Sequence, residues 1–314
     1  MIEIHRILCP IDFSIASDHA LRYAMKMAHW YDARLHVLHV MPPLPPTATS
    51  PIAEARRQLT ERDLAAAIAR SQRPGVSVAS ELIESAAPAA RILEFSEALD
   101  ADLIVTGNHG RQGLKRMLLG SVVEPLLHQS RRPVLVIPAR LAPAHLQHPV
   151  TFTRIICAVD FSTPSLAALE YAFSIAEESY ANLTLLNVIE LPPVLAGPTP
   201  PPDFNLYQVR AAAEAERLTQ LGALVPEAAR AFCTVDTTVL EGGASRQVLR
   251  LADAQNADLI VLGVHGRHAL DLAIFGSNSQ EVVTGAHCPL LIVPAGRCAR
   301  RHGRTHAARA VVRQ

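Results

Sequence analysis

The sequence predicts two tandem α/β domains, each built on a doubly wound, five-stranded parallel sheet. Three observations lead to this fold class. The chain of 314 residues repeats one pattern twice, and each copy alternates short apolar runs with stretches of helical periodicity. The apolar runs have few polar interruptions, as expected for parallel strands that helices cover on both faces. A chain of this length also favours two hydrophobic cores over one.

The repeat consists of four pairs of segments that occur in the same order in both halves. The pairs are 5–14 with 153–162, 34–43 with 182–193, 100–111 with 256–267, and 131–139 with 287–295. Each unit spans roughly 145 residues, which is the size of a domain. We therefore expect a first domain over 1–143, a second over 150–296 and an arginine-rich, solvated tail over 297–314. The prolines of 140–151 suit a linker between the domains.

Strands and helices alternate within each unit. The strands expected in the first half are 4–10, 35–40, 76–83, 103–106 and 134–137. The first helix has one apolar face, because Ala20, Leu21, Ala24, Met25 and Ala28 follow helical spacing. Right-handed crossovers would place such helices on both sides of the sheet. In sheets of this kind, ligands bind beyond the carboxyl ends of the strands, where the strand order reverses.

The composition argues against several classes of protein. Lysine plus arginine and aspartate plus glutamate both number 29, so no net charge attracts nucleic acid or an anionic membrane. The chain has no run of about 18 apolar residues for a membrane span, and its first residues lack the apolar stretch of a secretion signal. The five cysteines show no C-x-x-C spacing, which suits reduced thiols. We expect a cytoplasmic protein without membrane or nucleic-acid partners.

A glycine pattern follows the fourth expected strand of each half. It comprises Gly107, Gly110, Gly120 and Ser121 in the first copy, and Gly263, Gly266, Gly276 and Ser277 in the second. Glycine lets a phosphate approach the backbone closely, and a serine hydroxyl with the free N–H groups of a helix start can bind its oxygens. The alternative is that these glycines are turn or cap residues. Their recurrence between a strand and a helix in both halves favours phosphate binding.

One aspartate ends the first strand of each half, at the edge of the sheet where the glycine pattern also lies. There the carboxylates of Asp12 and Asp160 could accept hydrogen bonds from a ribose hydroxyl or an adenine amino group. The alternative is that they cap the first helix. His109 and His265 follow the first glycine of each copy, either packing within their own loop or lying beside the phosphate or ribose.

The pattern G-2x-G-9x-G-(S/T), between a D-x-S segment and a final P-V-L-V-V-P-like strand, resembles the universal stress protein family. The resemblance covers both halves, as in a tandem member. It implies a Rossmann-like sheet of strand order 3-2-1-4-5 that binds ATP. It implies adenosine contacts from Asp12 and Val40 and from Asp160 and Val188. It also implies phosphate contacts from the glycines and serines above and from the Val122 amide.

The second copy departs from the family pattern after its serine, because Asn278 stands where the first copy has Val122. The loops differ in charge as well: the first carries Arg111, Lys115 and Arg116 without an acid, whereas the second sets Arg267 against Asp271. We therefore expect the first half to bind ATP more tightly. Because family members generally pair through the last strand, we also expect 133–138 beside 289–294 as an internal pseudo-dimer.

These features favour a regulatory stress-response protein that binds ATP, with or without Mg²⁺, and lacks efficient catalysis. No Walker lysine and no G-x-S-x-G nucleophile motif is present, so we expect no catalytic residue. A slow ATPase or other nucleotide-using enzyme, and a structural stress factor without nucleotide, remain the alternatives. Cys298, His302 and His306 are too loosely spaced to predict a metal site. Pairing of two chains into a homodimer stays open.

Overall fold

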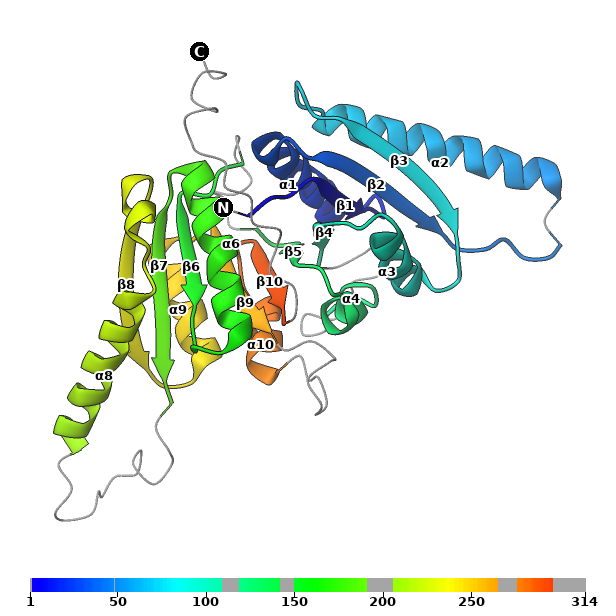
Figure 1. Ribbon diagram of the computed structural model, residues 1–314. Coiled ribbons are helices and arrows are strands. Elements are labelled where there is room, and N and C mark those ends of the chain that lie inside the picture. Colours follow the sequence, from blue (N-terminus) through cyan, green and yellow to red (C-terminus); the bar gives the residue numbers. More distant parts are fainter. Residues whose placement is uncertain are drawn as a thin grey trace.

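The computed structural model describes residues 2–47, 49–108, 119–141, 150–190, 206–264 and 276–295. Figure 1 shows two α/β halves side by side, with β5 and β10 meeting between them. The first half contains β1 (Arg6–Pro10), α1 (Ile15–Tyr31), β2 (Arg34–Met41), α2 (Ser50–Ser71), β3 (Val78–Glu84), α3 (Pro88–Ala98), β4 (Leu103–Gly107), α4 (Val123–Gln129) and β5 (Val134–Ile137). The second contains β6 (Arg154–Ala158), α6 (Thr163–Ser179), β7 (Asn182–Ile189), α8 (Leu206–Ala223), the 3₁₀ turn η1 (Glu227–Ala231), β8 (Thr234–Glu241), α9 (Ala244–Gln255), β9 (Leu259–Val264), α10 (Ser277–Gly285) and β10 (Leu290–Pro294).

The strand order is β3-β2-β1-β4-β5-β10-β9-β6-β7-β8. Each half thus has the expected order, and all pairs within a half are parallel. The sequence predicts two separate five-stranded sheets. In the structure they are joined edge to edge into a single ten-stranded sheet. The join is the antiparallel pair β5–β10, in which Leu135 faces Leu291. This pairing matches the expected contact of 133–138 with 289–294, and it covers an edge that each half would otherwise expose.

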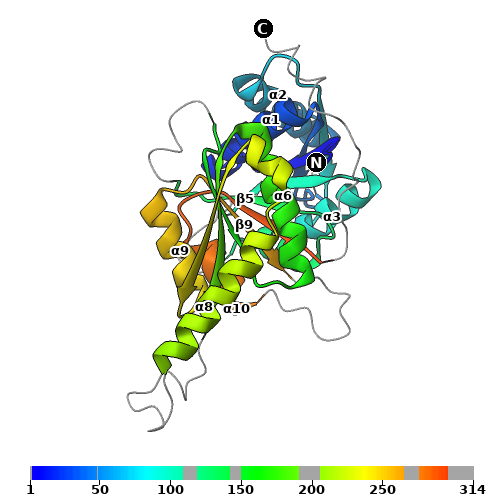
Figure 2. The ribbon, with the colours of Figure 1, turned by 60° about the vertical axis from the view of Figure 1, so that its left-hand side comes forward.

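Helices cover both faces of the sheet and divide the core into two layers. One apolar layer involves α1, α2, α6 and α8, and the other involves α3, α4, α9 and α10. Figure 2 shows the second half nearly edge-on, with α9 and α10 on one side and α6 and α8 on the other. The predicted apolar face of the first helix is buried, since Ala20, Leu21, Ala24, Met25 and Ala28 are at most 1% exposed.

Side-chain contacts of α1 also hold the two halves together. Phe152, just before β6, is fully buried and packs against the rings of Tyr23 and Trp30 on α1, at centroid distances of 5.8 and 5.6 Å. The Tyr31 hydroxyl lies 3.2 Å from the Ser174 hydroxyl of α6, in a buried hydrogen bond. The first core layer is consequently continuous across the two halves.

The repeated A-D-L-I-V segment supports the start of the central strands. The Asp102 carboxylate accepts hydrogen bonds from the N–H groups of His5 and Arg6, at 2.8 and 2.9 Å. Asp258 does the same at the start of β6, accepting from the N–H groups of Thr153 and Arg154, both at 2.9 Å, and from the Thr153 hydroxyl. A carboxylate that receives backbone donors is well suited to a strand end, because these groups have no ladder partner there.

Candidate functional site

The turn after β1 has a defined hydrogen-bond pattern. Asp12 accepts a hydrogen bond from the Ser14 N–H at 3.0 Å, and its own N–H donates to the Ser17 hydroxyl at 3.3 Å. Ser14 is the N-cap of α1, and its hydroxyl accepts from the Ser17 N–H. Between them Phe13 adopts a left-handed φ of 62°, which is uncommon for a bulky residue and is held here by the surrounding bonds.

The second half repeats this turn after β6. Asp160 accepts from the N–H (2.9 Å) and the hydroxyl of Ser162, its N–H donates to the Ser165 hydroxyl, and Phe161 has a φ of 64°. Ser162 is the N-cap of α6. The alternative that Asp12 and Asp160 cap the first helix is therefore wrong, because Ser14 and Ser162 fill that position. The aspartates instead brace the turn, each through a bond to the N–H two residues on.

Burial would raise the pKa of Asp160, but the hydrogen bonds from Ser162 and Ser165 outweigh it and hold the pKa below its usual value. The side chain lies at the surface. Asp160 is thus an ionised hydrogen-bond acceptor at neutral pH, and its carboxylate is too weak a base to act as a general base near neutrality.

The first glycine of each motif lies against the start of a helix. Gly107 ends β4, and a Cβ placed on it would come within 2.8 Å of the Ala16 backbone and side chain in α1. Gly263 lies in β9, and its Cβ would come within 2.2 Å of the Pro164 backbone and 2.4 Å of the Ser165 N. Close packing of strand against helix therefore accounts for these two glycines. Their contact with a phosphate stays a prediction.

The glycine–serine pairs differ between the halves. Gly120, Ser121 and Val122 precede α4, which begins at Val123, and the Gly120 N–H donates to the Asn108 carbonyl at 3.2 Å. The helix thus begins two residues after Ser121.

In the second half Gly276 is the N-cap of α10, and Ser277 is the first, exposed residue of that helix. A Cβ on Gly276 would meet no atom within 4 Å. The space in front of this helix start is therefore open among the described residues.

Several predicted site residues lie outside the described residues. These are His109, Gly110, His265 and Gly266, together with the loop charges Arg111, Lys115, Arg116, Arg267 and Asp271. Cys298, His302 and His306 of the tail lie outside them as well.

A cavity of about 170 Å³ opens at the carboxyl ends of β6, β7 and β9. It lies where the strand order reverses, because β6 has β7 on one side and β9 on the other. Asp160, Val188 and Gly263 line it, and so does Asn278, the residue that departs from the family pattern. The structure thus gathers predicted residues from three separate segments around one space. In the first half, Asp12 and Val40 occupy the matching positions after β1 and in β2.

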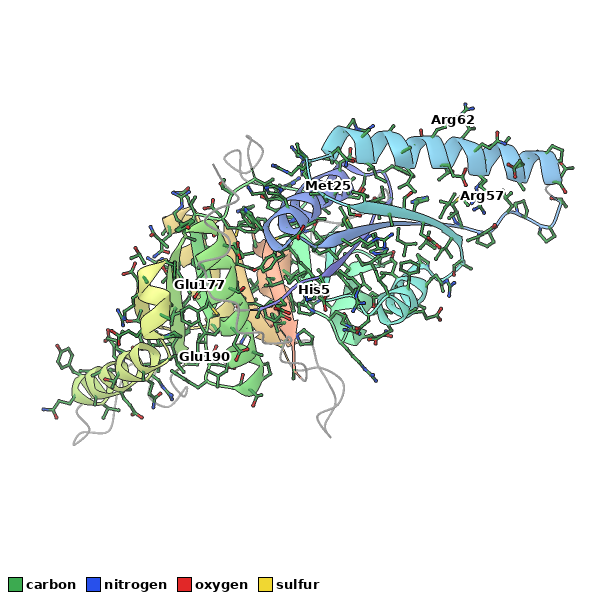
Figure 3. All side chains as sticks on the ribbon, turned by 45° about the horizontal axis from the view of Figure 1, so that its top comes forward. His5, Met25, Arg57, Arg62, Glu177 and Glu190 are labelled. Carbon is green, nitrogen blue, oxygen red and sulfur yellow. The ribbon has the colours of Figure 1, made fainter. Side chains whose placement is uncertain are left out.

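The described lining of this cavity combines apolar walls with neutral polar groups and one carboxylate. Its walls include Leu186, Val248 and Leu262, and Asp160 is the charged residue of the described lining. Glu190, at the end of β7 (Figure 3), accepts a hydrogen bond from the Ala244 N–H at the start of α9, at 2.9 Å. These carboxylates disfavour a phosphate on this side of the cavity.

The sequence interpretation missed four polar residues of the lining, namely Ser165, Asn187, Ser245 and Ser279. The Ser245 hydroxyl donates to Glu281 of α10, and Ser165 donates to the Ser162 carbonyl. Asn187 is 5% exposed and interrupts an apolar strand. That polar interruption at the carboxyl end of a buried strand was the available signal.

Among the described residues, no group of three or more His, Cys, Asp and Glu side chains could hold a metal ion. Within the same ranges, no helix is long and apolar enough to span a membrane. Cys9, Cys157, Cys233 and Cys288 are free and buried. Burial raises the pKa of the Cys288 thiol to about 12, so it stays protonated and unreactive at neutral pH.

Comparison with solved structures supports the fold. The chain is similar to a universal stress protein from Archaeoglobus fulgidus, with a TM-score of 0.68 and 22% identity over 93% of this chain and 98% of that one. Curated relatives of similar length include a universal stress protein from Mycolicibacterium smegmatis, 28% identical over 91% of this chain and 96% of its own. Another, from Mycobacterium tuberculosis, is 29% identical over 92% of this chain and 96% of its own.

The family model described as "Universal stress protein family" matches twice, over residues 3–138 and 151–294. These matches cover most of the chain and correspond to the two halves of the sheet. The chain therefore belongs to the universal stress protein family, as a tandem member with two Rossmann-like domains.

Proposed function

We propose that this protein binds an adenine nucleotide, ATP in the first place, in each half, and that occupancy regulates its contacts with another protein. The observation that carries the proposal is the cavity at the strand-order reversal of the second half, lined by Asp160, Val188 and Gly263. Membership of a family that often binds ATP supports it.

The chemistry of the described lining favours binding over catalysis. Asp160 has a depressed pKa and is therefore not a base tuned to neutral pH. Apolar walls with a few acceptors suit a base and a ribose, whose groups need to be held and not activated. A slow ATPase activity would need catalytic groups from the loops after β4 and β9, where the phosphate contacts are predicted.

The first test is mass spectrometry of nucleotide retained by the full chain after native purification, followed by calorimetric titration with ATP, with and without Mg²⁺. Retained or titratable ATP without rapid product formation is the expected result. A chain that takes up no ATP under either condition would contradict the proposal. Rapid formation of ADP would favour the enzyme alternative.

A substitution at the cavity wall assigns the sites to the halves. Ala244 lines the second cavity at the start of α9, so Ala244→Trp should block it and remove one binding step. Pro88, the first residue of α3, is the equivalent position in the first half and provides the matched Pro88→Trp variant. Because the first loop is more basic, the tighter step should survive in Ala244→Trp. Loss of the tighter step there would reverse the predicted ranking of the two sites.

A further inference from the structure

Asn187 lines the second cavity and carries a buried hydrogen-bond acceptor without a partner. Its side-chain Nδ2 donates to the Val159 carbonyl at 2.7 Å, and since a carbonyl only accepts, this bond fixes which end of the amide is nitrogen. The Oδ1 is fully buried without a hydrogen-bond partner, although the residue lines the cavity. Buried acceptors without a partner are rare and costly, so such a group indicates a donor that the chain itself does not supply.

We infer that Asn187 Oδ1 accepts a hydrogen bond from the exocyclic amino group of a base in the second cavity, and so makes this half select adenine. The inference rests on the proposed nucleotide binding and adds to it the group that reads the base. It assigns this role to a side chain of β7, in addition to the predicted contacts of Asp160 and Val188.

The size of the cavity supports the placement of a base. Its volume of about 170 Å³ is below the roughly 300–1,000 Å³ of pockets that enclose a drug-sized ligand. The described cavity therefore accommodates one portion of a nucleotide. Apolar residues of β7, α9 and β9 form its walls, as a flat heterocycle requires.

The charges around the cavity also favour the base of a nucleotide over its phosphates. Asp160 and Glu190 carry negative charge beside it, and Glu281 accepts from Ser245 in its wall. The start of α9 is occupied, because its Ala244 N–H already donates to Glu190. A base with an N–H donor suits these surroundings, whereas a phosphate would be repelled.

The first half carries a different residue at the equivalent position. His39 Nδ1 lies 2.7 Å from the Ile11 carbonyl, so the imidazole makes the bond that Asn187 makes to Val159. Its ring packs beside Phe13, with a centroid distance of 4.5 Å. The molecule thus supplies its own matched substitution: Asn187→His keeps a donor to the carbonyl and removes the amide oxygen.

The experiment compares ATP with purine riboside triphosphate, which differs from ATP by the absence of the amino group. Both are titrated into the full chain, and the binding step that Ala244→Trp removes is assigned to the second half. For that step we expect ATP to bind about 10-fold more tightly or better, as for a buried acceptor left unpaired by the analogue. In Asn187→His the preference should fall to about twofold or less, with an unchanged melting temperature.

Each result decides the inference. An unchanged preference for ATP in Asn187→His would overturn it and would indicate that Oδ1 is bonded to water. If Asn187→His does not fold, Asn187→Ala gives the same ratio, because loss of the Val159 bond affects both ligands alike. If the unmodified chain binds no ATP in the step sensitive to Ala244→Trp, the proposed function fails for this half and the inference fails with it.

Discussion

The two halves share the backbone geometry of the site and differ in the side chains around it. The turns at Asp12 and Asp160 have the same hydrogen bonds and the same left-handed phenylalanine. The carbonyl that follows the first strand is bonded by His39 in one half and by Asn187 in the other. Both halves thus supply a donor at this position, from side chains of different shape and polarity.

The largest expected effect comes from weakening the contact between the two halves at Phe152. Phe152 is fully buried against Tyr23 and Trp30, so Phe152→Ala should lower the free energy of unfolding by about 3–5 kcal/mol. Urea denaturation followed by Trp30 fluorescence, the single tryptophan of the chain, measures it directly. Phe152→Leu is the control and should lose much less. If Phe152→Ala unfolds at the same urea concentration as the unmodified chain, the two halves do not depend on this contact.

The motif glycines should differ in their tolerance of a methyl group. In Gly263→Ala the new Cβ would overlap the Pro164 backbone at 2.2 Å, and we expect a loss of about 3 kcal/mol in unfolding free energy. In Gly107→Ala the nearest atoms are at 2.8 Å, and we expect about 1–2 kcal/mol. Thermal denaturation without nucleotide measures both losses.

Gly222→Ala is the matched control for the glycine pair. Gly222 lies in α8 with no atom within 4 Å of an added Cβ, so alanine there should be neutral or stabilise by up to about 1 kcal/mol. Equal, small losses at Gly107 and Gly263 would contradict helix packing as the reason for these glycines. Larger losses than in the control would confirm helix packing as their role.

The aspartates before β4 and β9, which bond the starts of β1 and β6, give a smaller difference. Asp258 is 5% exposed and accepts from the backbone and the hydroxyl of Thr153, whereas Asp102 is more exposed and accepts backbone donors alone. Asp258→Ala should therefore cost about 2–3 kcal/mol and Asp102→Ala about 1–2 kcal/mol. Chemical denaturation at neutral pH measures the pair. A larger loss for Asp102→Ala would contradict this order.

Most of the fold was predictable because the pattern occurs twice and is dominated by buried strands. The strand order and the last-strand pairing, which the resemblance to the universal stress protein family implies, agree with the structure. The contact of Gly263 with Pro164 joins residues far apart in the sequence, and no local pattern signals it. Capping by the aspartates was a reasonable alternative because aspartate and serine both favour the N-cap position, and only the geometry distinguishes Asp160 from Ser162.

The motif residues of the candidate site could be predicted from the sequence, whereas the other side chains that line it were harder to predict. Asp160, Val188 and Gly263 follow from motifs, since the carboxyl ends of parallel strands meet at one edge. Asn187 does not, because an asparagine in a strand gives no indication of whether both ends of its amide find partners. That accounting requires the packed structure.

The smallest expected effect is a difference in acid sensitivity between the halves. His19 in α1 and His36 in β2 each have a buried ring nitrogen without a partner, and the equivalent residues of the second half are Ala167 and Thr184. Burial is the main cause that lowers the pKa of both histidines below the usual 6.5, and Arg22 and Arg34 add to it. Above that pH both the folded and the unfolded chain are neutral at these sites. As the pH falls below 6.5, the unfolded chain binds protons first, so the stability of the first half decreases.

Hydrogen exchange at neutral pH and at about pH 5.5, corrected for intrinsic rates, resolves this difference by half. Peptides from α1 and β2 should lose protection relative to those from α6 and β7, by less than about 1 kcal/mol because both rings are partly exposed. The control is the double variant His19→Ala, His36→Thr, which carries the second half's residues and should remove the difference. If the first half of this variant remains more acid-sensitive, the histidines are not its cause. In that case the cause would lie in the charged side chains around the turn of the first half. The backbone hydrogen bonds of the two turns are the same and cannot explain a difference.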